Sequence, residues 1–174
     1  KEAGELLPTL GEMSLGANPQ PQASDVIEAP TTAEEKARYA HERCHALTAA
    51  MQGFRPSGEP LVVGTEEYPT EVFHSAFRLP NSTVIVDAEN GYLTLDAFKK
   101  AMTSMQRSPA IVRSANAAEI EKMVPGTKSS TIASAKPLAR RLLQWGDTLS
   151  SPPQPERSQS ITDMAAKAAA IVKG

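Results

Sequence analysis

Residues 82–98, STVIVDAENGYLTLDAF, contain the clearest change of secondary structure in the sequence. The β-branched run at 82–86 predicts a strand, because such side chains pack well on a pleated surface. Asn90 and Gly91 predict the turn that follows, and Thr94 is placed to cap a helix. The apolar face of this helix holds Leu95, Phe98, Met102 and Met105. A strand followed at once by a helix argues against an all-helical protein.

Short apolar runs on either side predict further strands. They are PLVVG at 60–64 and AIVR at 110–113. TEVFHSAF at 70–77 stays ambiguous, because the spacing of Phe73 and Phe77 fits both a helix and a strand. The sequence therefore predicts an α+β or small α/β fold, with a helix-rich central body and two or three short strands. Extended Pro-rich arms are expected to flank this body.

The strongest helix signal follows Thr32. Thr32 and Glu35 match a capping box, and Gly53 is placed to end a helix over 33–52. A narrow stripe of mostly small side chains runs along this helix at three- and four-residue spacing. It consists of Ala33, Ala37, Ala40, Cys44, Leu47 and Met51. Such a stripe predicts close packing against another helix.

Composition predicts one folded domain with an arm at each end. Leu, Ile, Val and Phe together supply only 33 of the 174 residues, so the core is expected to be small. Residues 1–30 are acidic, and their Pro- and Gln-rich second half predicts an extended N-terminal arm. The central globular body is assigned to 31–149. Residues 150–174 are expected to form a Pro-rich spacer and an Ala-rich C-terminal helix.

Several protein classes are excluded by simple counts. No apolar run approaches the roughly 20 residues that cross a bilayer, so a membrane-spanning protein is not expected. The single cysteine, Cys44, cannot form an internal disulfide, and it stands in no recognisable nucleophile motif. No signal peptide is visible after Lys1, so the location is left open beyond a soluble protein.

The segment His41-Glu42-Arg43-Cys44-His45 matches the pattern H-E-x-x-H inside the predicted helix. Two histidines four residues apart share a helix face and can both bind zinc, while the glutamate activates a bound water. The segment resembles the signature of zincin metalloproteases, which implies His41 and His45 as zinc ligands and Glu42 as general base. The third ligand would be one of His74, Glu66, Glu67 and Glu71. The competing interpretation packs Cys44 in the small stripe, with both histidines partly solvated beside it.

Residues 86–98 resemble two other kinds of metal site. An EF-hand calcium loop is not expected, because Val86, Ala88 and Ala97 occupy positions that require carboxylates. The strand followed by Asp87-x-Glu-Asn resembles the opening of NYN-type ribonuclease domains, which implies Asp87 as a Mg²⁺ ligand. The competing interpretation of this stretch is a turn between the strand and the next helix.

The later part of the chain predicts two helices and a group of cations. One helix begins at Asn116, which pairs with Glu119 in a capping arrangement, and another covers 137–145. The cations between 125 and 146 are Lys128, Lys136, Arg140 and Arg141. They could neutralise a few nucleic-acid phosphates, but an exposed helix face is the favoured interpretation, since the whole chain has a net charge of −2.

The leading functional hypothesis from the sequence is a structural or assembly subunit of a larger complex, for example a virus particle. Its arms would dock on neighbouring chains, its partners would be protein subunits, and it would need no cofactor. A zinc metallopeptidase is the alternative. A metal-dependent nuclease or a nucleic-acid-binding adaptor is a second alternative.

Overall fold

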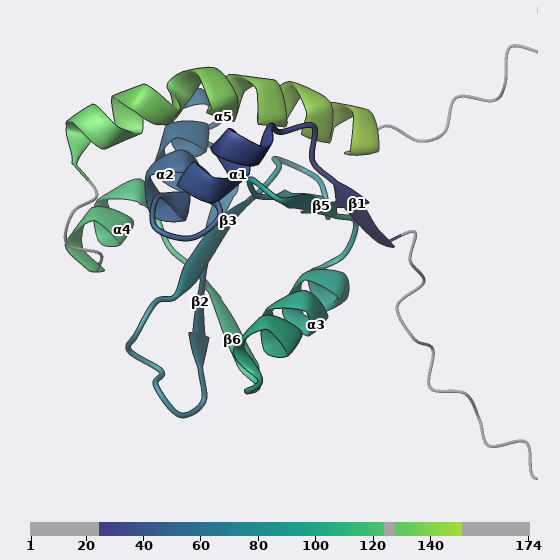
Figure 1. Cartoon of the computed structure of the whole chain (residues 1–174), viewed down its shortest axis with the longest axis vertical. Coiled ribbons are helices and arrows are strands. Elements are labelled where there is room, and N and C mark those ends of the chain that lie inside the picture. Colours follow the sequence, from purple (N-terminus) through teal and green to yellow (C-terminus); the bar gives the residue numbers. More distant parts are fainter. Residues whose placement is uncertain (1–24, 124–127, 151–174) are drawn as a thin grey trace, which may run out of the picture.

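The structure, a computed structural model, describes residues 25–123 and 128–150 of the chain, and within them six strands form one antiparallel sheet (Figure 1). The order of the strands is β1-β5-β4-β3-β2-β6. The strands are β1 (Val26–Glu28), β2 (Glu59–Thr65), β3 (His74–Arg78), β4 (Ile85–Val86), β5 (Asn90–Tyr92) and β6 (Ala110–Ser114). The helices are α1 (Ala33–Tyr39), α2 (Cys44–Phe54), α3 (Leu95–Gln106), α4 (Ala117–Met123) and α5 (Ser129–Ser150). The fold is therefore a mixed α+β fold.

Helices cover both faces of the sheet. The helices α2 and α5 pack together over one face, and α3 covers the other (Figure 1). Because side chains alternate along a strand, β3 contributes to both layers. Phe77 belongs to the cluster under α2 and α5, whereas Ala76 belongs to the cluster under α3. Among the described helices, none is long and apolar enough to cross a bilayer.

The predicted helix caps are confirmed. Thr32 accepts a hydrogen bond from the Glu35 backbone N–H at 3.1 Å, and the Glu35 carboxylate accepts one from the Thr32 N–H at 2.9 Å. Asn116 and Glu119 form the same reciprocal pair at the start of α4. Thr94 accepts from the Ala97 N–H and begins α3 as expected. These caps can be predicted from sequence because the capping side chain and the unpaired backbone N–H groups that it satisfies lie within one turn of the chain.

The sheet is larger than the sequence predicts. Six strands replace the expected two or three, and the segment at 70–77 forms strand β3 rather than a helix. The stretch that follows β4 is a hairpin turn into β5, not a turn into a helix. Both β4 and β5 are too short to show an alternating pattern, and pairing with their neighbours holds them in the sheet.

The predicted helix over 33–52 is broken at 40–43 into α1 and α2. The first helix is tied to α5, because Tyr39 donates a hydrogen bond to the Ser134 carbonyl at 3.2 Å. The second lies on β3, where Ser75 donates to Thr48 at 3.1 Å. Residues 40–43 form a turn between these two contacts. The expectation of a continuous helix over 33–52 is therefore wrong.

The body extends beyond the predicted limits at its N-terminal side. The strand β1 lies within the range assigned to the arm, and Val26 pairs with Tyr92 in the sheet. The globular part therefore includes residues 26–28. At the other end, α5 begins at Ser129 and is longer than the predicted 137–145. The remaining arm residues, 1–24 and 151–174, lie outside the described part of the chain.

Candidate active site

Cys44 is the first residue of α2, and only 1% of it is exposed. The N–H groups in the first turn of a helix have no carbonyl partners within that helix, so this end carries partial positive charge. Arg43 occupies the N-cap position but its side chain makes no capping hydrogen bond. A thiol at such a position ionises more readily than one in water, because the helix end stabilises the thiolate.

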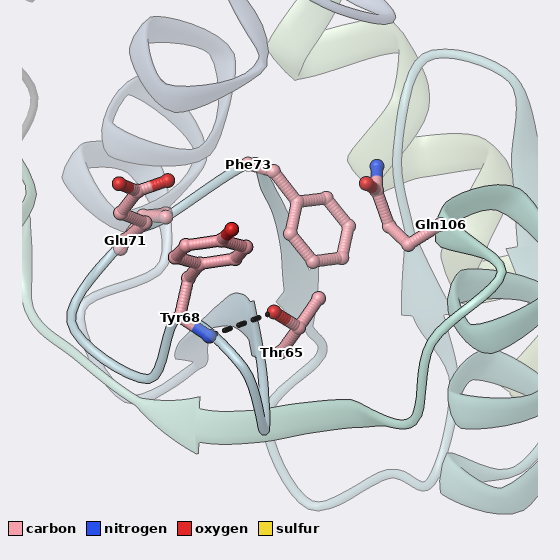
Figure 2. Close-up of a pocket in the computed structure, with 6 residues that line it drawn as sticks. Thr65, Tyr68, Glu71, Phe73 and Gln106 are labelled. Carbon is pink, nitrogen blue, oxygen red and sulfur yellow. Dashed lines mark hydrogen bonds between the residues drawn. The ribbon is translucent and has the colours of Figure 1, made fainter.

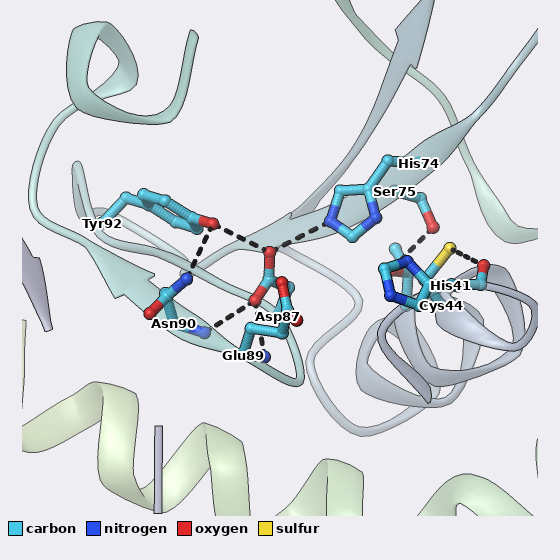
Figure 3. Close-up of polar contacts among 9 residues, drawn as sticks. His41, Cys44, His74, Ser75, Asp87, Glu89, Asn90 and Tyr92 are labelled. Atoms are coloured by element: carbon cyan, nitrogen blue, oxygen red, sulfur yellow. Dashed lines mark hydrogen bonds and ion pairs between the residues drawn. The ribbon is translucent and has the colours of Figure 1, made fainter. Parts of the chain in front are cut away.

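His74 and Asp87 form a buried pair beside this helix end. His74 begins β3, and its Nε2 lies 3.0 Å from Asp87 Oδ2. The other carboxylate oxygen accepts hydrogen bonds from the backbone N–H groups of Glu89 and Asn90, each at 2.8 Å. Tyr92 donates its hydroxyl proton to Oδ2 at 3.2 Å. The carboxylate is thus held in one orientation by three neighbours besides the imidazole (Figure 3).

The His74 ring lies between Asp87 and Cys44 (Figure 3). Since Nε2 faces the carboxylate, Nδ1 is the ring nitrogen left for the thiol. Burial favours the neutral thiol, but hydrogen bonding and Coulombic attraction from His45 and His74 to the ionised sulfur outweigh it and lower the pKa of Cys44 to about 5. Burial likewise opposes a charged imidazole, yet Asp87 and Cys44 raise the pKa of His74 to about 10. At neutral pH the pair is therefore a thiolate and an imidazolium.

Aromatic residues on the α3 side support the His74 ring. The rings of His74 and Phe98 are 6.4 Å apart, and Tyr92 meets Phe98 edge-on at 5.0 Å. Burial and the nearby Asp87 carboxylate raise the pKa of Tyr92, so its hydroxyl keeps its proton. Tyr92 can therefore act as a permanent hydrogen-bond donor to the carboxylate.

The Cys44–His74 pair predicts a bell-shaped dependence of stability on pH. A lowered thiol pKa stabilises the fold above the unfolded value of about 8.5, and this gain is lost as the pH falls through about 5. A raised imidazole pKa stabilises the fold below about 6.5, and this gain is lost as the pH rises through about 10. The free energy of unfolding should rise by about 2 kcal/mol from pH 5 to 6.5, stay level to 8.5 and then fall.

Urea unfolding at about pH 5, 7.5 and 10 measures this profile. Cys44→Ser is the matched control, because it removes the thiol titration and leaves the surface carboxylates unchanged. The rise above pH 5 should disappear in that variant. The ion pair would be contradicted by equal slopes in the two proteins over that range.

The H-E-x-x-H residues do not share one helix face. His41 and Glu42 are exposed in the turn before α2, whereas His45 is 5% exposed inside that helix. His45 is therefore buried rather than partly solvated, which corrects that expectation. His74, named as a possible third zinc ligand, bonds instead to Asp87. No cluster of three His, Cys, Asp or Glu side chains suited to a metal occurs within 25–123 and 128–150.

The acidic residues that the sequence offered as metal ligands are not arranged around a metal site in the described part of the chain. Three glutamates were candidates for the third zinc ligand: Glu66, Glu67 and Glu71. All three are exposed, and they lie in the loop between β2 and β3. Asp87 directly follows β4, whose pairings with β3 and β5 are both antiparallel. It is only 3% exposed and its oxygens bond to neighbouring protein groups. A Mg²⁺ ion would have to replace those bonds.

A small hollow of about 120 Å³ lies near the start of β3. Its lining consists of Thr65, Tyr68, Glu71, Val72, Phe73 and Gln106 (Figure 2). Thr65 accepts a hydrogen bond from the Tyr68 N–H at 3.1 Å, which fixes one side of the loop. A side chain at Gly64 would come within 2.8 Å of the Glu71 carbonyl, so this loop can fold over β2 only above a glycine. Phe73, which lines the hollow, directly precedes His74 in the chain.

Two of the predicted phosphate-binding cations have contacts inside the body. Arg141 pairs with Glu35 at 2.7 Å and donates to the Pro30 carbonyl at 3.2 Å, which ties α5 to α1. Arg140 lies over the Phe54 ring, 5.0 Å from its centroid. Lys128 and Lys136 are exposed. The basic segment is thus explained in part by packing between helices.

The arrangement of Cys44, His74 and Asp87 was not predicted from the sequence. The signal available was a single cysteine with a histidine and an aspartate further along the chain, which is a weak pattern without knowledge of their spatial contact. A comparison with protein-family models finds no match. Comparisons with curated proteins and with solved structures also find no match.

Proposed function

We propose that the protein is an enzyme that breaks or exchanges amide or ester bonds through a cysteine nucleophile. The observation that carries the proposal is the buried series Cys44–His74–Asp87, with 3.0 Å between the imidazole Nε2 and the carboxylate Oδ2. A nucleophile, a base and a group that orients the base are the three parts of a catalytic triad. Here each part comes from a different element: α2, β3 and the segment after β4.

The first half of the reaction forms a thioester. The Cys44 thiolate, whose proton is already held by His74 Nδ1, attacks the carbonyl carbon of the substrate. Negative charge then develops on the carbonyl oxygen, where the first-turn N–H groups of α2 can donate hydrogen bonds. The intermediate collapses as the bond to the amine or alcohol breaks, and His74 returns its proton to that leaving group.

The second half releases the acyl group. His74 accepts a proton from water, and the resulting hydroxide attacks the thioester carbon. The carbon–sulfur bond breaks, a carboxylic acid leaves, and the starting pair of thiolate and imidazolium is restored. An amine in place of water would give acyl transfer instead of hydrolysis. Asp87 orients the imidazole and stabilises the imidazolium, and Tyr92 holds this carboxylate in place through its hydrogen bond to Oδ2.

p-Nitrophenyl acetate tests the proposal, because it is a small acyl donor and Cys44 is buried. The wild-type protein should release p-nitrophenolate in a burst and carry one acetyl group on Cys44, seen by intact-mass and peptide mass spectrometry. Hydroxylamine should remove this group, as expected of a thioester. Cys44→Ala should lose the burst, and the matched control His41→Ala should keep it.

Two outcomes would contradict the proposal. Acetylation that persists unchanged in Cys44→Ala would place the reaction on another side chain. A burst of equal rate in His74→Gln would show that the imidazole takes no part in proton transfer. The assembly role predicted from the Pro-rich arms concerns residues 1–24 and 151–174, outside the described residues, and it stays a separate prediction.

A further inference from the structure

His45 follows the nucleophile directly and carries an unsatisfied polar atom. The residue is 5% exposed, and its Nδ1 is buried without a hydrogen-bond partner among the described residues. Buried side-chain nitrogens nearly always have a partner, because an unpaired one costs free energy. An exception beside a nucleophile calls for a functional explanation.

The nearest explanation is the state of the neighbouring sulfur. In the neutral thiol, Cys44 donates its hydrogen to the His41 carbonyl at 3.2 Å, so the sulfur is committed to the turn before α2. Once the thiol proton has moved to His74, the sulfur is an anion and can only accept hydrogen bonds. The ionised sulfur can then no longer donate to the His41 carbonyl, and a hydrogen-bond donor next to the sulfur would stabilise its negative charge.

We propose that His45 is a positioning residue for the nucleophile, which donates the hydrogen on Nδ1 to the ionised sulfur of Cys44. This inference rests on the proposed function. The thiol proton moves from Sγ to His74 Nδ1, while His45 keeps its own proton and no covalent bond to it breaks. The hydrogen bond holds the sulfur away from the His41 carbonyl. It also satisfies the buried Nδ1, so the reactive state is better bonded at this atom than the neutral state.

Other ionisable groups besides His45 lie on the elements around the Cys44 sulfur. His74 faces it from β3, and Asp87 and Tyr92 act on it through His74. His41, Glu42 and Arg43 of the preceding turn are exposed. The cations of the overlying helix are exposed as well; they are Lys136, Arg140 and Arg141. His45 therefore differs from the preceding-turn and α5 groups in being buried next to the nucleophile.

Alkylation by iodoacetamide measures the thiolate directly, because Cys44 is the one cysteine of the chain. The rate is followed by intact-mass spectrometry between about pH 4 and 10. We expect the midpoint of His45→Leu to lie about 1–2 pH units above that of the wild type. His45→Asn should restore most of this shift, because its amide can donate from the position of Nδ1. His45→Gln should not, because its amide lies where Nε2 was.

Every outcome of this experiment bears on the proposal. His41→Leu is the matched control, an exposed histidine four residues earlier whose replacement should leave the midpoint unchanged. An unchanged midpoint in His45→Leu would overturn the role of His45. If His45→Leu fails to fold, equal midpoints in His45→Asn and His45→Gln would overturn it. A midpoint that also stays unchanged in His74→Gln would reject the triad itself, which separates the two failures.

Discussion

Replacing His74 by Gln should move the pH midpoint of Cys44 alkylation from about 5 to above about 8. Glutamine can still donate a hydrogen bond to Asp87, so the buried carboxylate keeps a partner, but it cannot take the thiol proton. The thiol then returns toward its ordinary pKa, and burial pushes it further in the same direction. At about pH 6 the ionised fraction should fall about ninetyfold, and the greater nucleophilicity of a more basic thiolate reduces the net loss of rate with iodoacetamide to about three- to sixfold.

The measurement needs no substrate, so it is independent of the acyl group that the enzyme prefers. His41→Ala serves as the control, because His41 is exposed and only its backbone carbonyl contacts the thiol. A His74→Gln protein with the wild-type midpoint would mean that the helix end and His45 alone ionise the sulfur. The assignment of His74 as general base would then be wrong.

Replacing Asp87 by Ala should lower the free energy of unfolding by about 3–5 kcal/mol, a large share of the stability of a small domain. The substitution removes the acceptor of the Glu89 and Asn90 backbone N–H groups, which shape the hairpin turn between β4 and β5. It also leaves the fully buried His74 without its counter-charge and Tyr92 without its acceptor. Unsatisfied buried groups of this kind carry the largest single-residue costs.

Urea unfolding near neutral pH gives this number, and Asp87→Asn separates its two parts. Asparagine retains an oxygen for the two backbone donors but removes the charge, so it should cost less than alanine while still raising the alkylation midpoint of Cys44. A loss below about 1 kcal/mol in Asp87→Ala would show that the carboxylate is not an anchor of the fold.

The parts of the fold that depend on contacts within a few residues can be predicted from the amino-acid sequence. The caps at Thr32, Thr94 and Asn116 are confirmed, because a side chain and the N–H groups it satisfies belong to the same turn. The strands near 60–64 and 110–113 are also confirmed, since β-branched runs favour an extended backbone wherever they pack.

The break in the helix that carries the H-E-x-x-H pattern could not be predicted from local sequence signals. The local signals of that segment all favour one helix, and Arg43 provides no capping side chain. Tyr39 of α1 bonds to α5 and Thr48 of α2 bonds to β3, and the chain bends between these two contacts. Because of the bend, His41 and Glu42 lie in a turn, and Cys44 is the first residue of α2.

The candidate site is likewise a product of the sheet. Cys44, His74 and Asp87 are separated by 30 and 13 residues, so the contacts among these three residues are not local in the sequence. The antiparallel pairing of β3 with β4 brings His74 to Asp87, and the packing of α2 on β3 brings the helix start to His74. Burial then shifts the chemistry of all three groups, because an ion pair removed from water is governed by its neighbours rather than by solvent.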